Sequence, residues 1–312
     1  MYAPGGFVQF WYLGRDGVLG WYASRREAGP APMVRHASPV DIPAAPRDVA
    51  LDARDIRVRF GELEAVAGVD LEVRHGEIVG LIGTNGAGKT TFMNAVGGMV
   101  PAEGTVAIYG TDVTRMPAHR RHRHHLGRTF QTATLFPDLT VKETVQVALE
   151  TRMTTRLRTA LIPSPVAFAH ERRQSATADD LIDFLGLGAY ANSFIAELST
   201  GTRRIVELTC LVAGGSRLLC LDEPTAGVAQ REAEALVPLL QGIRRELDAS
   251  VLLIEHDMPL ILSLSDRVYC LEQGRVIASG PSDEIRDDPA VIASYLGTDQ
   301  RAIARSDAGT TV

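Results

Sequence analysis

One short segment constrains the fold of this chain more than any other, namely GTNGAGKTT from Gly83 to Thr91. Its spacing, G-x-x-x-x-G-K-T, is that of a P-loop, a glycine-rich turn whose backbone N–H groups surround phosphate groups. The apolar run Ile78–Ile82 leads directly into this segment. An apolar strand followed by a P-loop and a helix predicts a parallel α/β sheet, and the helix N-terminus adds a favourable dipole for an anion.

The lysine of this segment is unusual for the chain, because lysine occurs only twice among the 32 lysines and arginines. A compact ammonium on a flexible stem can lie along a phosphate chain inside a tight loop, whereas a wide planar guanidinium cannot. We therefore expect Lys89 to bind phosphate and the hydroxyl of Thr90 to bind Mg²⁺. The predicted phosphate site comprises Gly83, Thr84, Asn85, Gly86, Ala87, Gly88, Lys89, Thr90 and Thr91.

The composition argues against several classes of protein. The formal net charge of −6 gives no reason to expect a nucleic-acid partner. The three cysteines have neither the spacing of a metal site nor the even number of a disulfide framework. Cys220 and Cys270 lie in apolar runs, so we interpret them as small buried residues. The continuous apolar runs are far shorter than the ~20 residues that a membrane span needs.

The chain divides into zones of different composition. Residues 1–26 are rich in glycine and aromatic residues and lack the basic start and long apolar stretch of a signal peptide. Residues 27–50 are rich in proline and alanine and are predicted to form an extended linker. A globular nucleotide-binding domain is predicted for residues 51–297, followed by a flexible polar tail at 298–312.

Within the globular zone, short apolar runs alternate with helical patterns. The runs Leu218–Leu221 and Val251–Ile254 suit strands that are buried on both faces of a parallel sheet. Between these two runs, a crossover helix is predicted by the helical spacing of Leu236, Leu240, Ile243 and Leu247.

Two further stretches extend this core. Residues 52–74 and 104–109 alternate as β-strands do. A helical subdomain is predicted at about 132–214, and the capping box Thr140–Glu143 is expected to start one of its helices. The predicted fold class is therefore α/β, a P-loop NTPase core with a parallel sheet, an antiparallel β flank and a helical subdomain.

Acidic and histidine side chains follow the predicted strands. Asp222 ends an apolar strand beside the P-loop, where a carboxylate can bind Mg²⁺, and Glu223 is a plausible general base for an attacking water. His256 follows the next strand, and the carboxyl ends of parallel strands meet at one edge of a sheet. Taken singly, the acidic pair could be a solvated turn and the histidine a surface residue.

Two weaker signals complete the set. Gln131 is an uncharged side chain that could sense Mg²⁺ or water. Ser199 can cap a helix predicted for residues 202–214, and Gly201 allows a close backbone approach at a second helix N-terminus suited to an anion. As an isolated string, LSTG would usually be only a helix cap.

Together and in this order, these motifs resemble those of the ATP-binding subunit of an ABC transporter. The resemblance makes Phe60 the aromatic residue that stacks on adenine, GTNGAGKTT the Walker A motif and Gln131 the Q-loop. LSTGT at Leu198–Thr202 corresponds to the signature LSGGQ, and LLCLDEP at Leu218–Pro224 corresponds to Walker B with its glutamate. His256 corresponds to the switch histidine.

The resemblance implies an ATPase with ATP and Mg²⁺ as cofactors. Its catalytic residues would be Glu223, His256 and Gln131, and its Mg²⁺ would be held by Thr90, Gln131 and Asp222. Two such subunits, identical or different, would pair so that each ATP also meets the partner's signature residues Ser199, Thr200, Gly201 and Thr202. The implied partners are membrane permease subunits and, indirectly, an extracytoplasmic solute-binding protein. The implied location is the cytoplasmic face of the plasma membrane.

Longer segments resemble one subfamily in particular. RTFQTATLFPDLTVKETV, LLIEHDM and the closing GRVIASGPSDEIRDDPAVIASYLG are similar to the ATPases of branched-chain amino-acid importers, and less closely to those of urea or amide importers. The opening MYAPGGFVQF is similar to the C-terminal end of permeases from the same importers. Residues 1–26 are then a permease remnant or, alternatively, an unstructured leader from a mispredicted start.

The chain departs from the family pattern at two positions. Thr202 replaces the signature glutamine, and Ala229 stands where an acidic or amide residue often crosses the dimer interface. Both departures concern coupling between subunits, so a nucleotide-gated module with little hydrolysis stays an alternative. A soluble ABC ATPase outside transport is a second alternative, although the chain lacks the long coiled coil or second nucleotide domain usual there. We interpret the basic run from His119 to Arg128 as a solvated arginine-rich helix rather than a metal or nucleic-acid site.

Overall fold

The computed structural model describes residues 48–130, 135–152, 165–228 and 230–295. These residues form two compact units. The sheet unit contains the described residues up to 132, those of 215–227 and those from 236 onward, and the helical unit contains those of 133–214 and 228–235. The predicted leader, most of the predicted linker and the predicted tail lie outside the described residues.

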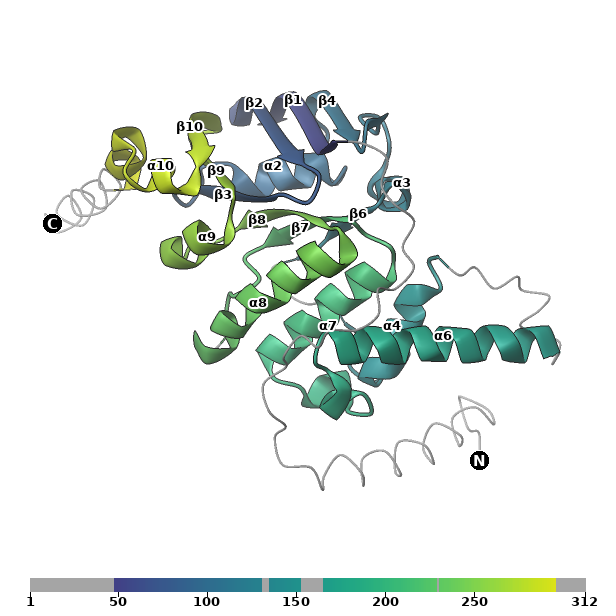
Figure 1. Ribbon diagram of the computed structural model, residues 1–312. Helices are drawn as coiled ribbons and strands as arrows, with labels where there is room; N and C mark the ends of the chain where they lie inside the picture. Colours follow the sequence, from purple (N-terminus) through teal and green to yellow (C-terminus); the bar gives the residue numbers. More distant parts are fainter. Residues whose placement is uncertain (1–47, 131–134, 153–164, 229, 296–312) are drawn as a thin grey trace, which may run out of the picture. The chain divides into compact units, whose positions relative to one another are not determined.

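The sheet unit is built around a six-stranded sheet with the order β10–β9–β3–β8–β7–β6 (Figure 1). Neighbours from β9 to β6 run parallel, and β10 pairs with β9 in the antiparallel sense. Every residue of β3, β7 and β8 is buried, which confirms the three apolar runs as strands covered on both faces. The strands are β3 (Ile78–Gly83), β6 (Leu126–Arg128), β7 (Leu218–Asp222), β8 (Ser250–Ile254), β9 (Arg267–Glu272) and β10 (Arg275–Pro281).

A second sheet of four antiparallel strands forms the predicted β flank, in the order β2–β1–β4–β5. Helix α2 (Lys89–Val96) packs against both sheets, and its Phe92 and Met93 are fully buried in the shared apolar core. The linker predicted to reach residue 50 is too long by two residues, since β1 already begins at Val49. The four strands are β1 (Val49–Phe60), β2 (Leu63–Arg74), β4 (Glu103–Ile108) and β5 (Thr111–Asp112).

Three further helices contribute to the sheet unit, namely α8 (Gln230–Leu247), α9 (Met258–Leu264) and α10 (Ser282–Arg286). Helix α8 connects β7 to β8 and belongs to the sheet unit from Leu236 onward. This confirms the predicted crossover helix, and its apolar stripe is buried at Leu236, Leu240, Ile243 and Leu247. Cys220 and Cys270 are free and buried, as predicted.

The helical unit contains α4 (Val141–Leu149), α6 (Pro165–Phe184) and α7 (Thr200–Ala213), with 3₁₀ turns at Gly188–Tyr190 and Ile195–Glu197. The predicted capping box starts α4. The Glu143 backbone N–H donates to Thr140 Oγ1 at 3.2 Å, and the Thr140 N–H donates to Glu143 Oε2 at 2.9 Å. Helix α4 is tied to α6 by an ion pair of 2.7 Å between Lys142 Nζ and Asp179 Oδ1.

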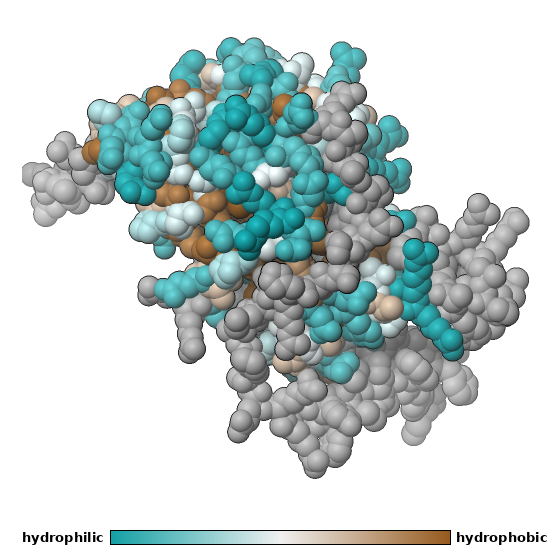
Figure 2. Space-filling model, viewed as in Figure 1, coloured by the Kyte–Doolittle hydropathy of each residue, from teal (hydrophilic) through white to brown (hydrophobic). Residues whose placement is uncertain are grey.

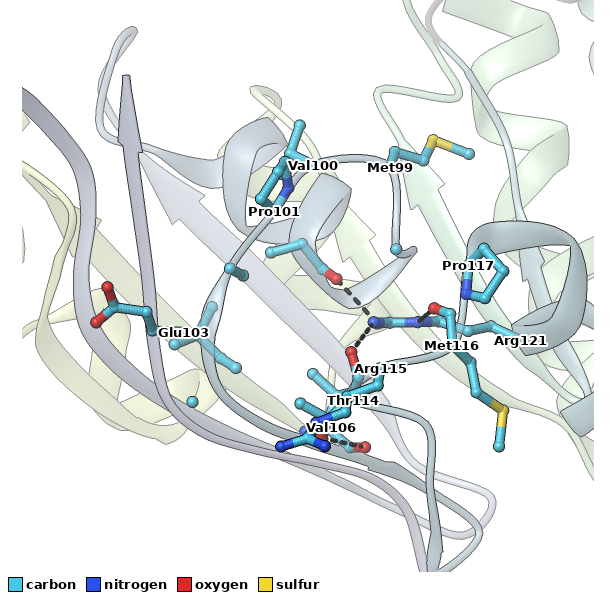
Figure 3. A pocket seen from close by; sticks show the side chains of 15 residues that line it. Met99, Val100, Pro101, Glu103, Val106, Thr114, Arg115, Met116, Pro117 and Arg121 are labelled. Carbon is cyan, nitrogen blue, oxygen red and sulfur yellow. Dashed lines mark hydrogen bonds between the residues drawn. The ribbon is translucent and has the colours of Figure 1, made fainter. Parts of the chain in front are cut away.

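The interpretation of the basic run as a solvated helix is right only in part, since His119, Arg120, Arg123 and His125 are exposed but most of the run is not helical. The run forms only the short helix α3 (Ala118–Arg121), a 3₁₀ turn at His122–His124 and strand β6. Arg121 is 4% exposed. Its guanidinium donates at 2.6–2.9 Å to the backbone carbonyls of Ala95, Val96, Thr114 and Met116. Arg121 also lines a pocket of about 380 Å³ (Figure 3). The physical reason is that the last carbonyls of α2 lack partners within the helix, and a buried cation satisfies them.

Hydrophilic residues predominate among the described residues on the face shown in Figure 2. A few large apolar side chains are exposed, among them Phe136 and the cross-strand neighbours Phe60 and Leu63 of the β1–β2 hairpin. Within the described ranges, no helix combines the length and the apolar character that crossing a bilayer requires.

Candidate functional site

The P-loop connects the buried strand β3 to helix α2, as the sequence predicts. Gly83 and Gly88 have φ angles of +144° and +101°, a region that disfavours residues with a Cβ. A Cβ on Gly88 would overlap the backbone carbonyl oxygen of Ala65, and a Cβ on Gly83 would overlap that of Leu271. Both glycines are therefore required by the close approach of neighbouring backbone.

Lys89 is the first residue of α2 and lies folded into the P-loop. Its Nζ donates to the carbonyl oxygens of Gly83 at 2.7 Å and Thr84 at 3.1 Å. Burial lowers the pKa of the Lys89 ammonium, whereas the nearby carboxylates of Glu223 and Asp222 raise it. The ammonium thus lies inside the loop that the phosphate groups would occupy, and it donates to two neutral carbonyl groups that a phosphate could replace.

Asp222 ends β7 beside the P-loop helix, and its carboxylate is nearly inaccessible to solvent. Its Oδ1 accepts a long hydrogen bond of 3.4 Å from Thr90 Oγ1, its Oδ2 faces Arg128 Nη2 at 3.5 Å, and its N–H donates to Thr129 Oγ1 at 3.1 Å. Burial raises the pKa of Asp222, and the Arg128 charge opposes this rise. The hydroxyl and the carboxylate are oxygen donors of the kind that Mg²⁺ prefers beside a bound phosphate, so these residues fit a Mg²⁺ site.

Glu223 and His256 are brought together at the carboxyl ends of β7 and β8. Glu223 Oε1 and His256 Nε2 are 2.7 Å apart. The backbone of Glu223 has a φ of +50°, which is rare for a residue with a side chain, and its N–H donates to Ile254 O at 2.9 Å. Strained residues of this kind cluster at functional sites, because the surrounding structure must hold them there.

A buried carboxylate connects the segments that follow β7 and β8, and so helps to hold Glu223 and His256 in place. Glu255 is 3% exposed, and its Oε1 accepts hydrogen bonds from the N–H and the hydroxyl of Thr225 at 2.9 and 2.7 Å. Its Oε2 accepts from the His256 N–H at 3.2 Å. Glu255 therefore joins the segment that follows Glu223 to the segment that carries His256.

Two aromatic residues belong to segments that contact the P-loop. Phe60 ends β1 and is 51% exposed, and the hairpin that carries it passes the P-loop at Ala65, whose carbonyl touches Gly88. A base could reach this exposed ring. Tyr295 accepts a hydrogen bond of 2.9 Å from the N–H of Gly83 through its hydroxyl, and so fixes the start of the loop.

The N-terminus of α7 belongs to the helical unit and carries the predicted signature residues. Ser199 caps the helix, as predicted, by accepting from the Thr202 N–H at 3.1 Å. The helix begins at Thr200, two residues earlier than the predicted start. Glu232 lies against this end, because Ser199 Oγ donates to its Oε1 at 2.8 Å and a Cβ on Gly201 would lie only 2.6 Å from its Oε2. A carboxylate thus already binds where an anionic phosphate would fit.

Gln131 and Ala229 lie outside the described residues. The sequence reading missed Arg128, Glu232, Glu255 and Tyr295. Glu255 lies in LLIEHDM and Tyr295 lies in IASYLG, two segments that resemble the family. Nothing in the sequence pattern indicates that Glu255 is buried or that Tyr295 reaches Gly83.

Comparisons with known proteins agree on one family. The profile described as "ABC transporter" matches residues 66–226, and that described as "Branched-chain amino acid ATP-binding cassette transporter" matches residues 275–300. The high-affinity branched-chain amino acid transport ATP-binding protein BraF of Pseudomonas aeruginosa is 36% identical over 248 residues, covering 79% of this chain and 97% of BraF.

Solved structures give the same result. The ATP-binding cassette MJ1267 of an ABC transporter, in its ADP conformation, superimposes with a TM-score of 0.66 at 26% identity, covering 80% of this chain and 99% of MJ1267. The cassette MJ0796, in a dimeric post-hydrolysis state bound to ADP and Pi, has a TM-score of 0.61 at 22% identity, covering 74% of this chain and 98% of MJ0796. The second likeness concerns the fold alone.

Proposed function

We propose a transport function for this chain, which belongs to the ABC transporter family. It is the ATP-binding and ATP-hydrolysing subunit of an importer for branched-chain amino acids or related small polar solutes. The observation that carries the ATPase part is the convergence of Lys89, Asp222, Glu223 and His256 at one edge of the six-stranded sheet. The solute class rests on the similarity to BraF and on the branched-chain profile at residues 275–300.

Each residue of the site has its own role in binding or hydrolysing ATP. The P-loop N–H groups and Lys89 bind the phosphates of ATP, and Phe60 stacks on the adenine. Thr90 and Asp222 would hold Mg²⁺, which would supply charge neutralisation on the phosphates. Glu223 takes the proton of the attacking water, and His256 orients Glu223 and the water through the 2.7 Å contact. Gln131 is assigned to sensing Mg²⁺ or water.

Assembly with other subunits is part of the proposal. Two ATPase subunits, identical or different, pair so that Ser199, Thr200, Gly201 and Thr202 of one meet the ATP of the other. This requires Glu232 to release Ser199, because both the carboxylate and the phosphate need the same hydroxyl and helix end. The pair drives membrane permease subunits from the cytoplasmic face of the plasma membrane, and a solute-binding protein supplies them from the other side. No nucleic-acid partner is proposed.

Uptake of labelled solutes tests this function. We expect cells in which the gene is deleted to lose most of their high-affinity uptake of radiolabelled leucine, and to regain it with the wild-type gene but not with one encoding Glu223→Gln. Labelled urea and a short amide serve as comparison solutes. If leucine uptake is unchanged in the deletion strain and urea or amide uptake is lost instead, the subunit belongs to a urea or amide importer. No change in any uptake would contradict the transport role.

A further inference from the structure

We propose that Arg128 is a positioning residue of the metal site, which holds one carboxylate oxygen of Asp222 so that the other faces Thr90. This inference rests on the proposed function, because it concerns the Mg²⁺ that accompanies ATP. It assigns a role to a residue of the basic run, which the sequence pattern alone indicates to be a solvated surface segment.

The geometry separates the two oxygens of Asp222. Oδ1 lies 3.4 Å from Thr90 Oγ1, the hydroxyl assigned to Mg²⁺, and Oδ2 lies 3.5 Å from Arg128 Nη2. Arg128 is the last residue of β6, which pairs in parallel with β7 so that Arg128 lies opposite Cys220, two residues before Asp222. The register of two neighbouring strands therefore sets the guanidinium beside the carboxylate.

Both partners are removed from water. The side chain of Arg128 is 6% exposed and that of Asp222 is 2% exposed. A contact of 3.5 Å is long for a hydrogen bond, so the attraction is mainly one between opposite charges in a poorly solvated place. Lys89, the other nearby cation, donates to the carbonyls of Gly83 and Thr84. Arg128 is thus the cation that faces the carboxylate directly.

The rest of the guanidinium is held loosely by comparison. It stacks over the ring of Phe130 with 5.5 Å from Cζ to the ring centroid, and Nη1 lies 3.7 Å from Met99 Sδ. Within the described part of the chain, its buried Nε has no hydrogen-bond partner. Arg121, in the same basic run, has instead four carbonyl partners. Arg121 is suited to stabilising the fold. The main partner of the Arg128 guanidinium is instead the Asp222 carboxylate, which explains why a buried cation stands at this position.

Loss of Arg128 should therefore act on metal binding. Side chains that orient a metal-binding carboxylate typically change metal affinity or activity by about 10- to 100-fold when removed. In Arg128→Met the long apolar stem remains, but Asp222 loses the charge that holds Oδ2. The carboxylate can then rotate away from Thr90, which weakens its hold on a cation.

The test measures nucleotide binding rather than turnover. A fluorescent, non-hydrolysable ATP analogue is titrated onto the purified full-length chain at a series of Mg²⁺ concentrations and in EDTA. For Arg128→Met we expect the half-saturating Mg²⁺ concentration to rise about 10-fold or more, with little change of affinity in EDTA. The same variant should leave more Mn²⁺ free, as measured by its electron paramagnetic resonance signal in the presence of the analogue.

Two variants control the experiment. Arg128→Lys keeps the charge and should recover most of the Mg²⁺ dependence. It also tests the inference if Arg128→Met does not fold. Because a point charge replaces the guanidinium only in part, Arg128→Lys should still need more Mg²⁺ for half-saturation than the wild type, by a smaller factor than expected for Arg128→Met. Arg121→Met removes an equally buried arginine and should lower the melting temperature without changing the Mg²⁺ dependence.

Two results would overturn the inference. An unchanged half-saturating Mg²⁺ concentration with a lower melting temperature would make Arg128 purely structural, and a lower half-saturating concentration would make it a cation that competes with Mg²⁺. Failure of the proposed function is distinguishable, because the wild-type chain itself would then show no Mg²⁺-dependent binding of the analogue.

Discussion

Glu223→Gln is expected to lower the rate of ATP hydrolysis by about 10²- to 10⁴-fold, the usual contribution of a positioned general base. The amide keeps the shape of the side chain and can still contact His256, but it cannot accept the proton of the attacking water. ATP affinity should stay close to that of the wild type, because Glu223 lies beyond the P-loop contacts made by Lys89. Single-turnover hydrolysis and equilibrium binding of a labelled ATP measure the two quantities separately.

An exposed carboxylate provides the matched control for this variant. The side chain of Asp283 is 93% exposed and pairs with Arg286 on the same short helix. Asp283→Asn should hydrolyse ATP at the wild-type rate, since a solvated pair of this kind contributes little. A Glu223→Gln rate within a few-fold of the wild type would remove Glu223 from the role of general base.

Lys89→Ala should weaken nucleotide binding itself. Hydrogen bonds to charged groups contribute about 1.5–3 kcal/mol, so we expect the dissociation constant for Mg²⁺–ATP to rise by roughly 10- to 150-fold. Hydrolysis should fall with it, because the ammonium also neutralises charge on the transferred phosphate. Isothermal titration with a non-hydrolysable ATP analogue is the measurement.

The second lysine of the chain is the control for the first. Lys142 lies in α4 and pairs with Asp179 of α6, so Lys142→Ala removes an ammonium from the helical unit and leaves the P-loop intact. We expect its nucleotide affinity to equal that of the wild type. An equal affinity for Lys89→Ala would mean that GTNGAGKTT does not bind the phosphates.

The strands and the loop geometry follow from the sequence because local rules decide them. An apolar run of five residues such as Ile78–Ile82 can be satisfied only by burial on both faces, and β3 is buried throughout. Thr140 and Glu143 satisfy each other over three residues, so their capping box is readable without any tertiary contact.

The partners of the buried arginines in the basic run cannot be predicted from the local sequence. Charge alone favours solvent for an arginine, and nothing local to residues 119–128 reveals the carbonyls of α2 or the carboxylate of Asp222. These partners are 25 or more residues away in sequence, and only the sheet order brings them close. The same holds for Glu232 at the cap of α7, whose partner Ser199 is 33 residues away. Long-range polar partners of this kind require the fold before they can be recognised.

Release of inorganic phosphate from ATP by the purified wild-type chain would show directly whether this protein is an ATPase. The reaction is followed at saturating ATP, with Mg²⁺ and with EDTA, and with Lys89→Ala and Glu223→Gln in parallel. We predict steady release that requires Mg²⁺ and is lost in both variants. Binding of ATP without phosphate release above the protein-free blank would contradict the account and leave a nucleotide-gated binding module in its place.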